Sequence, residues 1–167
     1  GHNVKGVFIN RENFHQVVDE FKPDLIGYSG MDCERVPILK ANEEVRKKHK
    51  NIFSLIGGPL GTFSPDTIKD KYVDGVCQGE AEEAMPELID ALEKGKDISG
   101  ILNLSVKVDG KTFVNKVRPP IKDINTIDFP DREIFAHKKQ PGGLYNVLEG
   151  RGCPYNCTYC HNKRYKE

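Results

Sequence analysis

Three of the chain's five cysteines lie close together near its end, in the segment EGRGCPYNCTYCHN at residues 149–162. Cys153, Cys157 and Cys160 follow the pattern CxxxCxxC, which lets one short loop turn all three sulfurs toward a common point. Thiolates are soft metal ligands, and in a chain without secretory features they are more typical of metal sites than of disulfides. The segment therefore predicts metal chemistry.

Three ligands are one fewer than a closed structural zinc site needs, and the sequence has no second CxxC pair. His161 is the candidate fourth zinc ligand, but it directly follows Cys160, and adjacent residues rarely point at the same metal. An iron–sulfur cluster tolerates three cysteines when one iron is left open. The residues alone keep three interpretations: an iron–sulfur site, a zinc-stabilised interaction domain and a redox thiol.

The cysteine motif resembles that of the radical S-adenosylmethionine (radical SAM) superfamily, including the aromatic Tyr159 just before the last cysteine. The resemblance implies that Cys153, Cys157 and Cys160 hold a 4Fe-4S cluster whose open iron is chelated by S-adenosylmethionine, with Tyr159 near the adenine. It also implies a reaction: the reduced cluster cleaves S-adenosylmethionine to methionine and a 5′-deoxyadenosyl radical, which takes a hydrogen from substrate.

Length and composition limit the size of the fold, the partners and the location that can be expected of the chain. At 167 residues the chain is long enough for one domain and part of another. Lys+Arg and Asp+Glu are balanced at 25 each, so we expect no nucleic-acid surface. No apolar run reaches the roughly 18 to 20 residues that cross a bilayer, and no signal peptide is recognisable, so we expect no membrane partner and a cytoplasmic location. Cys33 and Cys77 are expected to be buried or half-buried thiols without chemistry.

Apolar runs alternate with helical patterns over the first hundred residues, as in βαβ units. The expected strands are residues 4–9, 24–29, 52–56 and 73–78, and the expected helices lie at residues 11–21, from about 37 to 48, from Ser64-Pro65, and at about 82–92. The sequence therefore predicts an α/β fold with a doubly wound, Rossmann-like or flavodoxin-like, mostly parallel sheet.

Alternating apolar residues around Asp109-Gly110 predict an added antiparallel hairpin at residues 101–116, because this dipeptide favours a type I′ turn. Residues 118–141 are expected to form an ordered strap. Residues 144–148 (LYNVL) predict a short strand directly before the cysteine loop, which is typical of a βα barrel. In radical SAM enzymes this would be the first barrel strand.

Three stretches, DLIGYSGM, IGGP and DGVCQGEAEEAMPELI, are similar to the cobalamin-binding domain that precedes the barrel in one large class of radical SAM enzymes. The resemblance implies that Ser29 lies beside the buried nucleotide tail of cobalamin and that Gly57 and Gly58 let this tail slide between strand ends. Gly79 and Glu80 match a corner of the family with a structural role or a contact to the corrin edge.

Relatives with this layout include anaerobic magnesium-protoporphyrin monomethyl ester cyclases and methyltransferases. The resemblance therefore implies an intact enzyme that performs cyclisation or methyl transfer with cobalamin assistance. Its partners would be a small-molecule substrate, such as a tetrapyrrole or another organic metabolite, and a reducing electron donor. This fragment itself is expected to be inactive and to contain no catalytic residue. The alternative is a non-catalytic cobalamin-binding module, or a degenerate one that has lost its ligand.

Four regions are expected along the chain. They are a cobalamin-binding-like domain without its first strand (1–98), the hairpin (99–117), the strap (118–141) and a truncated start of the barrel (142–167). Loss of a central first strand would leave a hole in the sheet. Either neighbouring strands close it, or a second copy of the chain fills it and makes a dimer.

Overall fold

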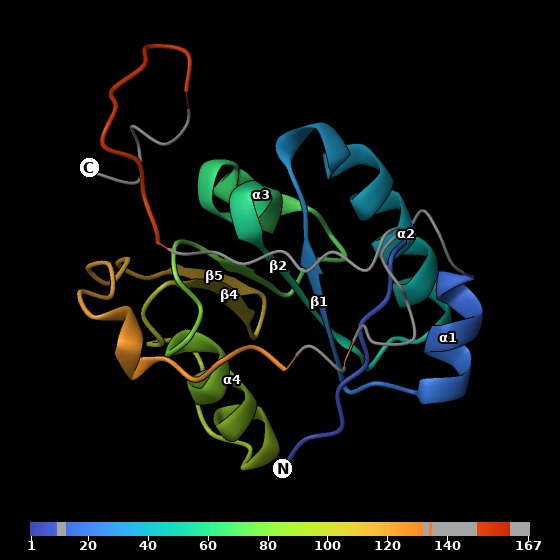
Figure 1. Ribbon diagram of the computed structural model, residues 1–167. Helices are drawn as coiled ribbons and strands as arrows, with labels where there is room; N and C mark the ends of the chain where they lie inside the picture. The colour runs from blue at the N-terminus through green and yellow to red at the C-terminus, as the bar shows by residue number, and fades with distance from the viewer. Residues whose placement is uncertain (10–12, 132–133, 135–149, 161–167) are drawn as a thin grey trace. The chain divides into compact units, whose positions relative to one another are not determined.

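The computed structural model describes residues 1–9, 13–131, 134 and 150–160 (Figure 1). The chain divides into two compact units, one of Gly1–Phe14 with Lys122–Glu167 and the other of His15–Ile121. The unit His15–Ile121 contains the whole of the described sheet. This unit therefore carries the strand ends at which the sequence predicts a ligand.

Helices alternate with strands along most of this unit. The strands are β1 (Leu25–Ser29), β2 (Phe53–Gly57), β3 (Gly75–Cys77), β4 (Leu104–Val108) and β5 (Lys111–Val114). The α-helices are α1 (Phe14–Phe21), α2 (Arg35–Lys48), α3 (Gly58–Phe63) and α4 (Ala84–Glu93), and short 3-10 turns lie at η1 (Asp32–Glu34), η2 (Pro65–Lys69) and η3 (Ile124–Thr126).

The five strands form one sheet in the order β1-β2-β3-β4-β5. β1 pairs with β2 and β2 with β3 in parallel, whereas β3–β4 and β4–β5 are antiparallel. The predicted α/β class, a parallel sheet with an added hairpin, is thus confirmed. The described strands pair without a gap, and β1 lies at the edge of the sheet rather than beside a hole. A dimer through this edge stays a prediction.

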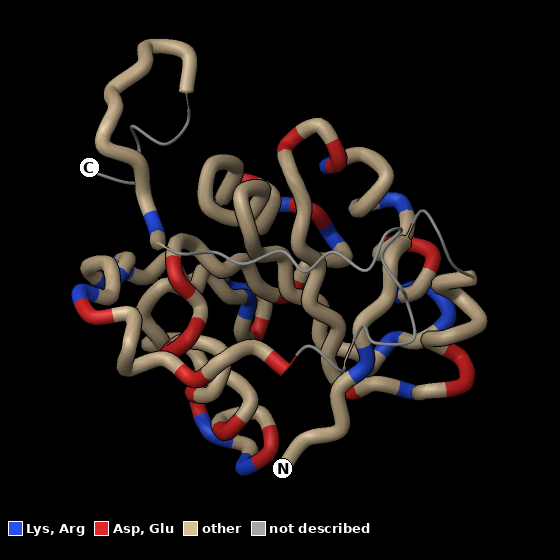
Figure 2. The backbone as a smooth tube through the Cα atoms, in the orientation of Figure 1, with Lys and Arg blue, Asp and Glu red and all other residues tan. Residues whose placement is uncertain are grey.

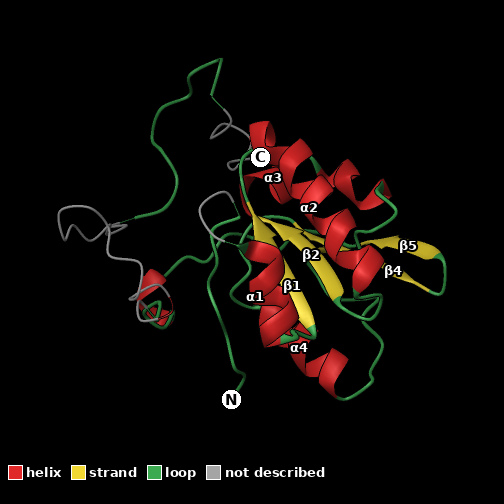
Figure 3. Cartoon of the chain, turned by 90° about the vertical axis from the view of Figure 1, so that its right-hand side faces the viewer, coloured by secondary structure: helices red, strands yellow, loops and turns green. Residues whose placement is uncertain are grey.

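The sheet has helices on both faces (Figure 3). On one face, the buried Asn42 of α2 accepts a hydrogen bond from the Ser54 hydroxyl at 2.7 Å. On the other, Leu88 of α4 packs in one apolar cluster with Leu55 and Val106. Since neighbouring residues of a strand point to opposite faces, Ser54 and Leu55 assign α2 and α4 to opposite sides. The unit is therefore doubly wound.

Local sequence signals explain several element boundaries. Ile38, Ala41 and Val45, spaced for one helix face, are the buried apolar residues of α2. Pro86 is the third residue of α4, inside its first turn, where a missing backbone N–H costs nothing. Asp109 and Gly110 both have positive φ, 50° and 74°, which is the backbone of the predicted type I′ turn.

Other expectations are wrong. Residues 4–9 form no strand, and Val4 is 63% exposed, because an apolar run becomes a strand only when another strand pairs with it. The helix expected from Ser64-Pro65 is only the 3-10 turn η2, since α3 begins directly after β2 at Gly58. Cys33 is exposed rather than buried. The predicted strand at 144–148 lies outside the described residues.

Acidic and basic residues are interspersed along the helices and loops, as Figure 2 shows. α2 ends in Arg46, Lys47 and Lys48, which favourably oppose the negative end of the helix dipole. Among the described residues, no helix is both long and apolar enough to span a membrane.

The first prediction concerns Gly61 in α3. Glycine-to-alanine changes usually stabilise a helix by roughly 1 kcal/mol, but a Cβ at Gly61 would lie 2.5 Å from the Cys77 carbonyl oxygen and 2.9 Å from that of Ile56. We expect Gly61→Ala to lower the free energy of unfolding by about 1–3 kcal/mol in urea titrations, because the helix must move off the sheet. Gly100→Ala is the control, since its Cβ would meet no atom within 4 Å. Stabilisation by Gly61→Ala would contradict the packing.

The second prediction compares two thiols. Cys77, the last residue of β3, is 3% exposed, and burial raises the pKa of its thiol to about 11. At pH 8 only about one such thiol in a thousand is ionised, so the native protein should leave Cys77 unlabelled by iodoacetamide while the exposed Cys33 reacts. Peptide mapping by mass spectrometry measures both. Equal labelling of the two in the folded chain would contradict this expectation.

Candidate functional site

The carboxyl ends of the parallel strands β1, β2 and β3 lie along one edge of the sheet, as in doubly wound folds that bind ligands there. Ser29, the last residue of β1, is the register partner of Gly57, the last residue of β2. Gly79 follows β3 by two residues. We use the name carboxyl edge for these strand ends, which comprise Ser29, Gly57, Gly58 and residues 78–80. The structure thus brings the predicted residues Ser29, Gly57 and Gly58 together.

Gly58 cannot be another residue without rearrangement. Its φ is +64°, which L side chains rarely adopt, and a Cβ there would lie 2.5 Å from the Ser29 Oγ and 3.5 Å from the backbone nitrogen of Gly30. The positive φ therefore favours glycine at this position, and any larger residue would also have to displace the Ser29 side chain. The exposed Ser29 hydroxyl therefore lies directly against the backbone that follows β2.

Gly57 differs, because nothing in its own surroundings requires glycine. Its φ is −136°, and a Cβ would lie 3.9 Å from the Tyr28 carbonyl oxygen and 4.0 Å from the Cys77 Cβ, ordinary contact distances. The half-buried Gly57 thus leaves a space of about one methyl group between the ends of β1 and β3. The absent side chain leaves the backbone of β2 uncovered at this point, and the approach of a ligand to it stays a prediction.

Thr62 of α3 connects the glycines of two strand ends. Its hydroxyl donates to the Gly58 carbonyl at 2.9 Å and accepts from the backbone N–H of Gly79 at 3.1 Å. The N–H of Leu60 donates to the Gly30 carbonyl at 2.8 Å, so α3 also holds the end of β1. Sequence reasoning missed Thr62. The only signal was a hydroxyl four residues after a helix-opening glycine.

Residues 78–80, which we call the β3 corner, turn at Gly79 with a φ of +71°. Asn103 holds this corner, because its Nδ2 donates to the carbonyls of Gln78 at 2.8 Å and Glu80 at 3.1 Å. The Glu80 carboxylate accepts from the Ile121 N–H at 2.5 Å. The side chain of Glu80 is thus engaged in holding the chain after the hairpin, the structural one of its two expected roles.

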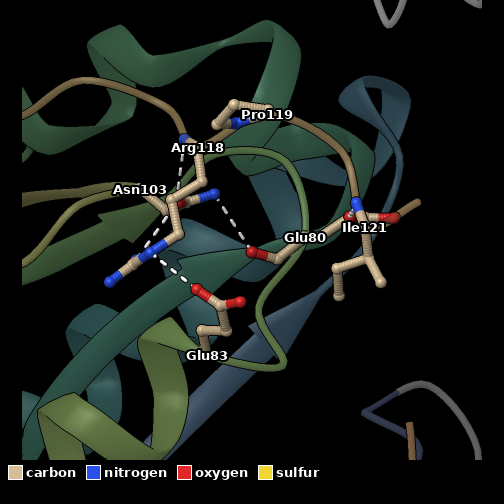
Figure 4. Close-up of a pocket in the computed structure, with 6 residues that line it drawn as sticks. All are labelled: Glu80, Glu83, Asn103, Arg118, Pro119 and Ile121. Carbon is tan, nitrogen blue, oxygen red and sulfur yellow. Dashed lines mark hydrogen bonds and ion pairs between the residues drawn. The ribbon is translucent and has the colours of Figure 1, made fainter. Parts of the chain in front are cut away.

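A small pocket opens beside the β3 corner (Figure 4). Its lining residues are Glu80, Glu83, Asn103, Arg118, Pro119 and Ile121. Its volume of about 10 Å³ is room for roughly one water molecule. The Arg118 guanidinium pairs with Glu83 at 2.9 Å and with Glu87 at 2.7 Å. The pocket is therefore too small for a cofactor, and its charges already have partners.

The predicted cluster ligands belong to the other unit. Cys153 and Cys160 are half-buried, Cys157 is exposed, and the Cys160 N–H donates to the Cys157 carbonyl at 3.1 Å. Tyr159 is 91% exposed. Within the described residues, which include all three cysteines, no group of three potential ligands is arranged to hold a metal ion. The three thiols are still a donor set that suits an iron–sulfur cluster, and the metal site stays a prediction. His161 lies outside the described residues.

The sequence of this chain is similar to those of known proteins. Residues 1–89 match the B12 binding domain family. An uncharacterised methyltransferase of Pyrococcus horikoshii is 32% identical over 152 residues, 87% of this chain and 33% of that protein. The anaerobic magnesium-protoporphyrin IX monomethyl ester cyclase of Rubrivivax gelatinosus is 24% identical over 168 residues, 91% of this chain and 29% of that protein. The chain thus spans about a third of the length of these relatives.

Solved structures share the fold. The radical S-adenosylmethionine methyltransferase TsrM from Kitasatospora setae superposes with a TM-score of 0.54 and 17% identity, over 65% of this chain and 22% of that one. The cobalamin-dependent S-adenosylmethionine radical enzyme OxsB gives a TM-score of 0.54 and 20% identity, over 69% of this chain and 16% of that one. The resemblance to cobalamin-binding radical SAM enzymes is confirmed, and the chain belongs to the B12 binding domain family.

Proposed function

We propose that this chain carries the cobalamin-binding domain and the cluster loop of a radical SAM enzyme, and that methyl transfer is the reaction class of the whole protein. One observation carries the proposal: the residues matched by the B12 binding domain family, 1–89, include every residue predicted on the cobalamin side. These are Ser29, Gly57, Gly58, Gly79 and Glu80. The Pyrococcus horikoshii relative, which is named a methyltransferase, supports methyl transfer, and the relative named a cyclase makes ring formation the second candidate.

The residues of the carboxyl edge would receive cobalamin, which when bound supplies a cobalt centre able to carry a methyl group or to assist electron transfer. Gly57 leaves the space for the ligand to approach the backbone. The exposed Ser29 hydroxyl can donate or accept a hydrogen bond. Ile56 and Leu60, which are fully buried, anchor β2 and α3 in the core next to these glycines.

The cysteine loop would hold the 4Fe-4S cluster through Cys153, Cys157 and Cys160, leaving one iron for S-adenosylmethionine, to which the reduced cluster supplies an electron. Tyr159 is the proposed contact for the adenine. The remaining proposed partners are a small-molecule substrate, such as a tetrapyrrole, and a reducing electron donor. A cytoplasmic location and a second copy pairing at the edge of β1 also remain proposals.

The cobalamin site is tested with hydroxocobalamin, followed by its visible spectrum and by retention on gel filtration. Gly57→Val should weaken binding by about tenfold or more, because the side chain fills the space that the ligand needs. Gly100→Val is the matched control, since that position has no neighbour within 4 Å, and it should bind like the unmodified chain. Urea titrations check that both variants fold.

Absence of both a spectral change and retention with the unmodified chain would overturn the cobalamin part of the proposal. The degenerate module, which keeps the fold without the ligand, would then be favoured. Equal affinity of Gly57→Val and Gly100→Val would instead show that cobalamin binds elsewhere.

The cluster is tested by anaerobic reconstitution with iron and sulfide. We expect about four irons per chain and a broad visible absorption that bleaches on reduction, because three thiolates hold the cluster. Alanine at Cys153, Cys157 or Cys160 should abolish the absorption, whereas Cys33→Ala, which removes an exposed cysteine outside the motif, should keep it. Stoichiometric zinc without this absorption would support the zinc-stabilised interaction domain instead.

A further inference from the structure

Asn103 lies directly before β4 in an unusual conformation. Its φ is +70°, in the left-handed region that asparagine tolerates better than most residues, and it is only 2% exposed. A buried amide is costly unless its polar atoms have partners. The surroundings of Asn103 should therefore explain both its conformation and its burial.

The side chain of Asn103 has the partners that a primary amide can take. Nδ2 donates to the carbonyls of Gln78 and Glu80, and Oδ1 accepts from Arg118 through its backbone N–H at 3.1 Å and its Nη1 at 3.2 Å. Two carbonyls face the nitrogen and two N–H groups face the oxygen, which fixes the orientation of the amide. Aspartate would present oxygen to both carbonyls, and alanine would leave four polar groups without this partner.

The backbone of Asn103 holds the same region. Its carbonyl accepts from the Gln78 N–H at 2.8 Å, and its N–H donates to the Lys116 carbonyl at 2.9 Å. A Cβ at Gly79 would lie 3.4 Å from the Asn103 Nδ2. The β3 corner is thus held by hydrogen bonds from Asn103 and by Thr62, whose hydroxyl accepts from the Gly79 N–H.

Asn103 also holds the segment that follows the hairpin, residues 118–121. Arg118 binds Asn103 and the Leu102 carbonyl, the latter at 2.8 Å, and Ile121 binds the Glu80 carboxylate. Residues 118–121 therefore attach to the β3 corner through Asn103 and Glu80. Figure 4 shows Asn103 between Arg118 and Glu80.

We propose that Asn103 is a positioning residue that holds the β3 corner in its ligand-binding conformation and fastens residues 118–121 to that corner. The link to a ligand rests on the proposed cobalamin function. The Asn103 side chain makes the hydrogen bonds to the β3 corner as well as those to Arg118. A substitution of Asn103 should therefore loosen both the β3 corner and residues 118–121.

The test compares Asn103→Asp with Asn115→Asp. Asn115 is the matched control, because its Nδ2 also donates to two carbonyls of the same region, Ser99 at 2.8 Å and Leu104 at 3.0 Å, without contacting the β3 corner. Hydrogen exchange of the Gly79 and Ile121 amides should be about tenfold faster or more in Asn103→Asp than in the control. Asn103→Gly, which keeps the left-handed backbone, should show the same pattern if Asn103→Asp fails to fold.

Affinity for hydroxocobalamin is measured on the same variants. Asn103→Asp, or Asn103→Gly in its place, should bind about tenfold more weakly than Asn115→Asp. Equal exchange at Gly79 and Ile121 in the Asn103 and Asn115 variants would overturn the positioning role. Faster exchange with unchanged affinity would overturn its importance for the ligand. If the unmodified chain binds no cobalamin, the proposed function fails, whereas the exchange comparison still decides whether Asn103 holds the corner.

Discussion

At position 58 the backbone φ is +64°, and a Cβ atom would lie 2.5 Å from the hydroxyl oxygen of Ser29. Parallel pairing brings the ends of β1 and β2 to the same edge, and a glycine at position 58 tolerates both the positive φ and the contact with the Ser29 side chain. α3 begins at that glycine, so its position follows from the contact. Through Leu60 and Thr62, α3 then holds Gly30 and Gly79. The arrangement of the carboxyl edge therefore depends on the left-handed backbone at Gly58 and on the hydrogen bonds that α3 makes.

Much of this architecture could be predicted from local sequence patterns. Apolar spacing identified α2 and α4, and Asp109-Gly110 identified the turn between β4 and β5. Residues 4–9 show the limit of this reasoning, since an apolar run indicates burial but supplies no partner strand. The start of α3 was missed. The next helix was expected only from Ser64-Pro65, whereas α3 already begins at Gly58.

The residues of the candidate site also divide into those that local sequence patterns indicate and those that such patterns do not reveal. Glycines after strands and cysteines at a fixed spacing are local signals, so Gly57, Gly58 and the three cysteines could be proposed from the sequence, and their roles stay predictions. Asn103 could not, because its partners Gln78 and Arg118 are 25 and 15 residues away. The cysteine motif specifies donor chemistry without specifying geometry, since metal sites of this kind are commonly assembled by the metal itself. Residue types near a ligand are therefore easier to predict than the residues that position them.

The attachment of residues 118–121 to the β3 corner depends on the direction of hydrogen bonds more than on charged pairs. Glu83 and Glu87, the acidic partners of Arg118, are 61% and 48% exposed, and ion pairs at such exposure contribute little because water screens them. The bonds of Arg118 to Asn103 lie in a more buried region, where an unpaired polar group is costly. Apolar packing alone would permit several arrangements of this segment. The buried Asn103 amide donates two hydrogen bonds through its nitrogen and accepts two through its oxygen. These bonds permit only one arrangement of the segment, and that arrangement fixes the β3 corner.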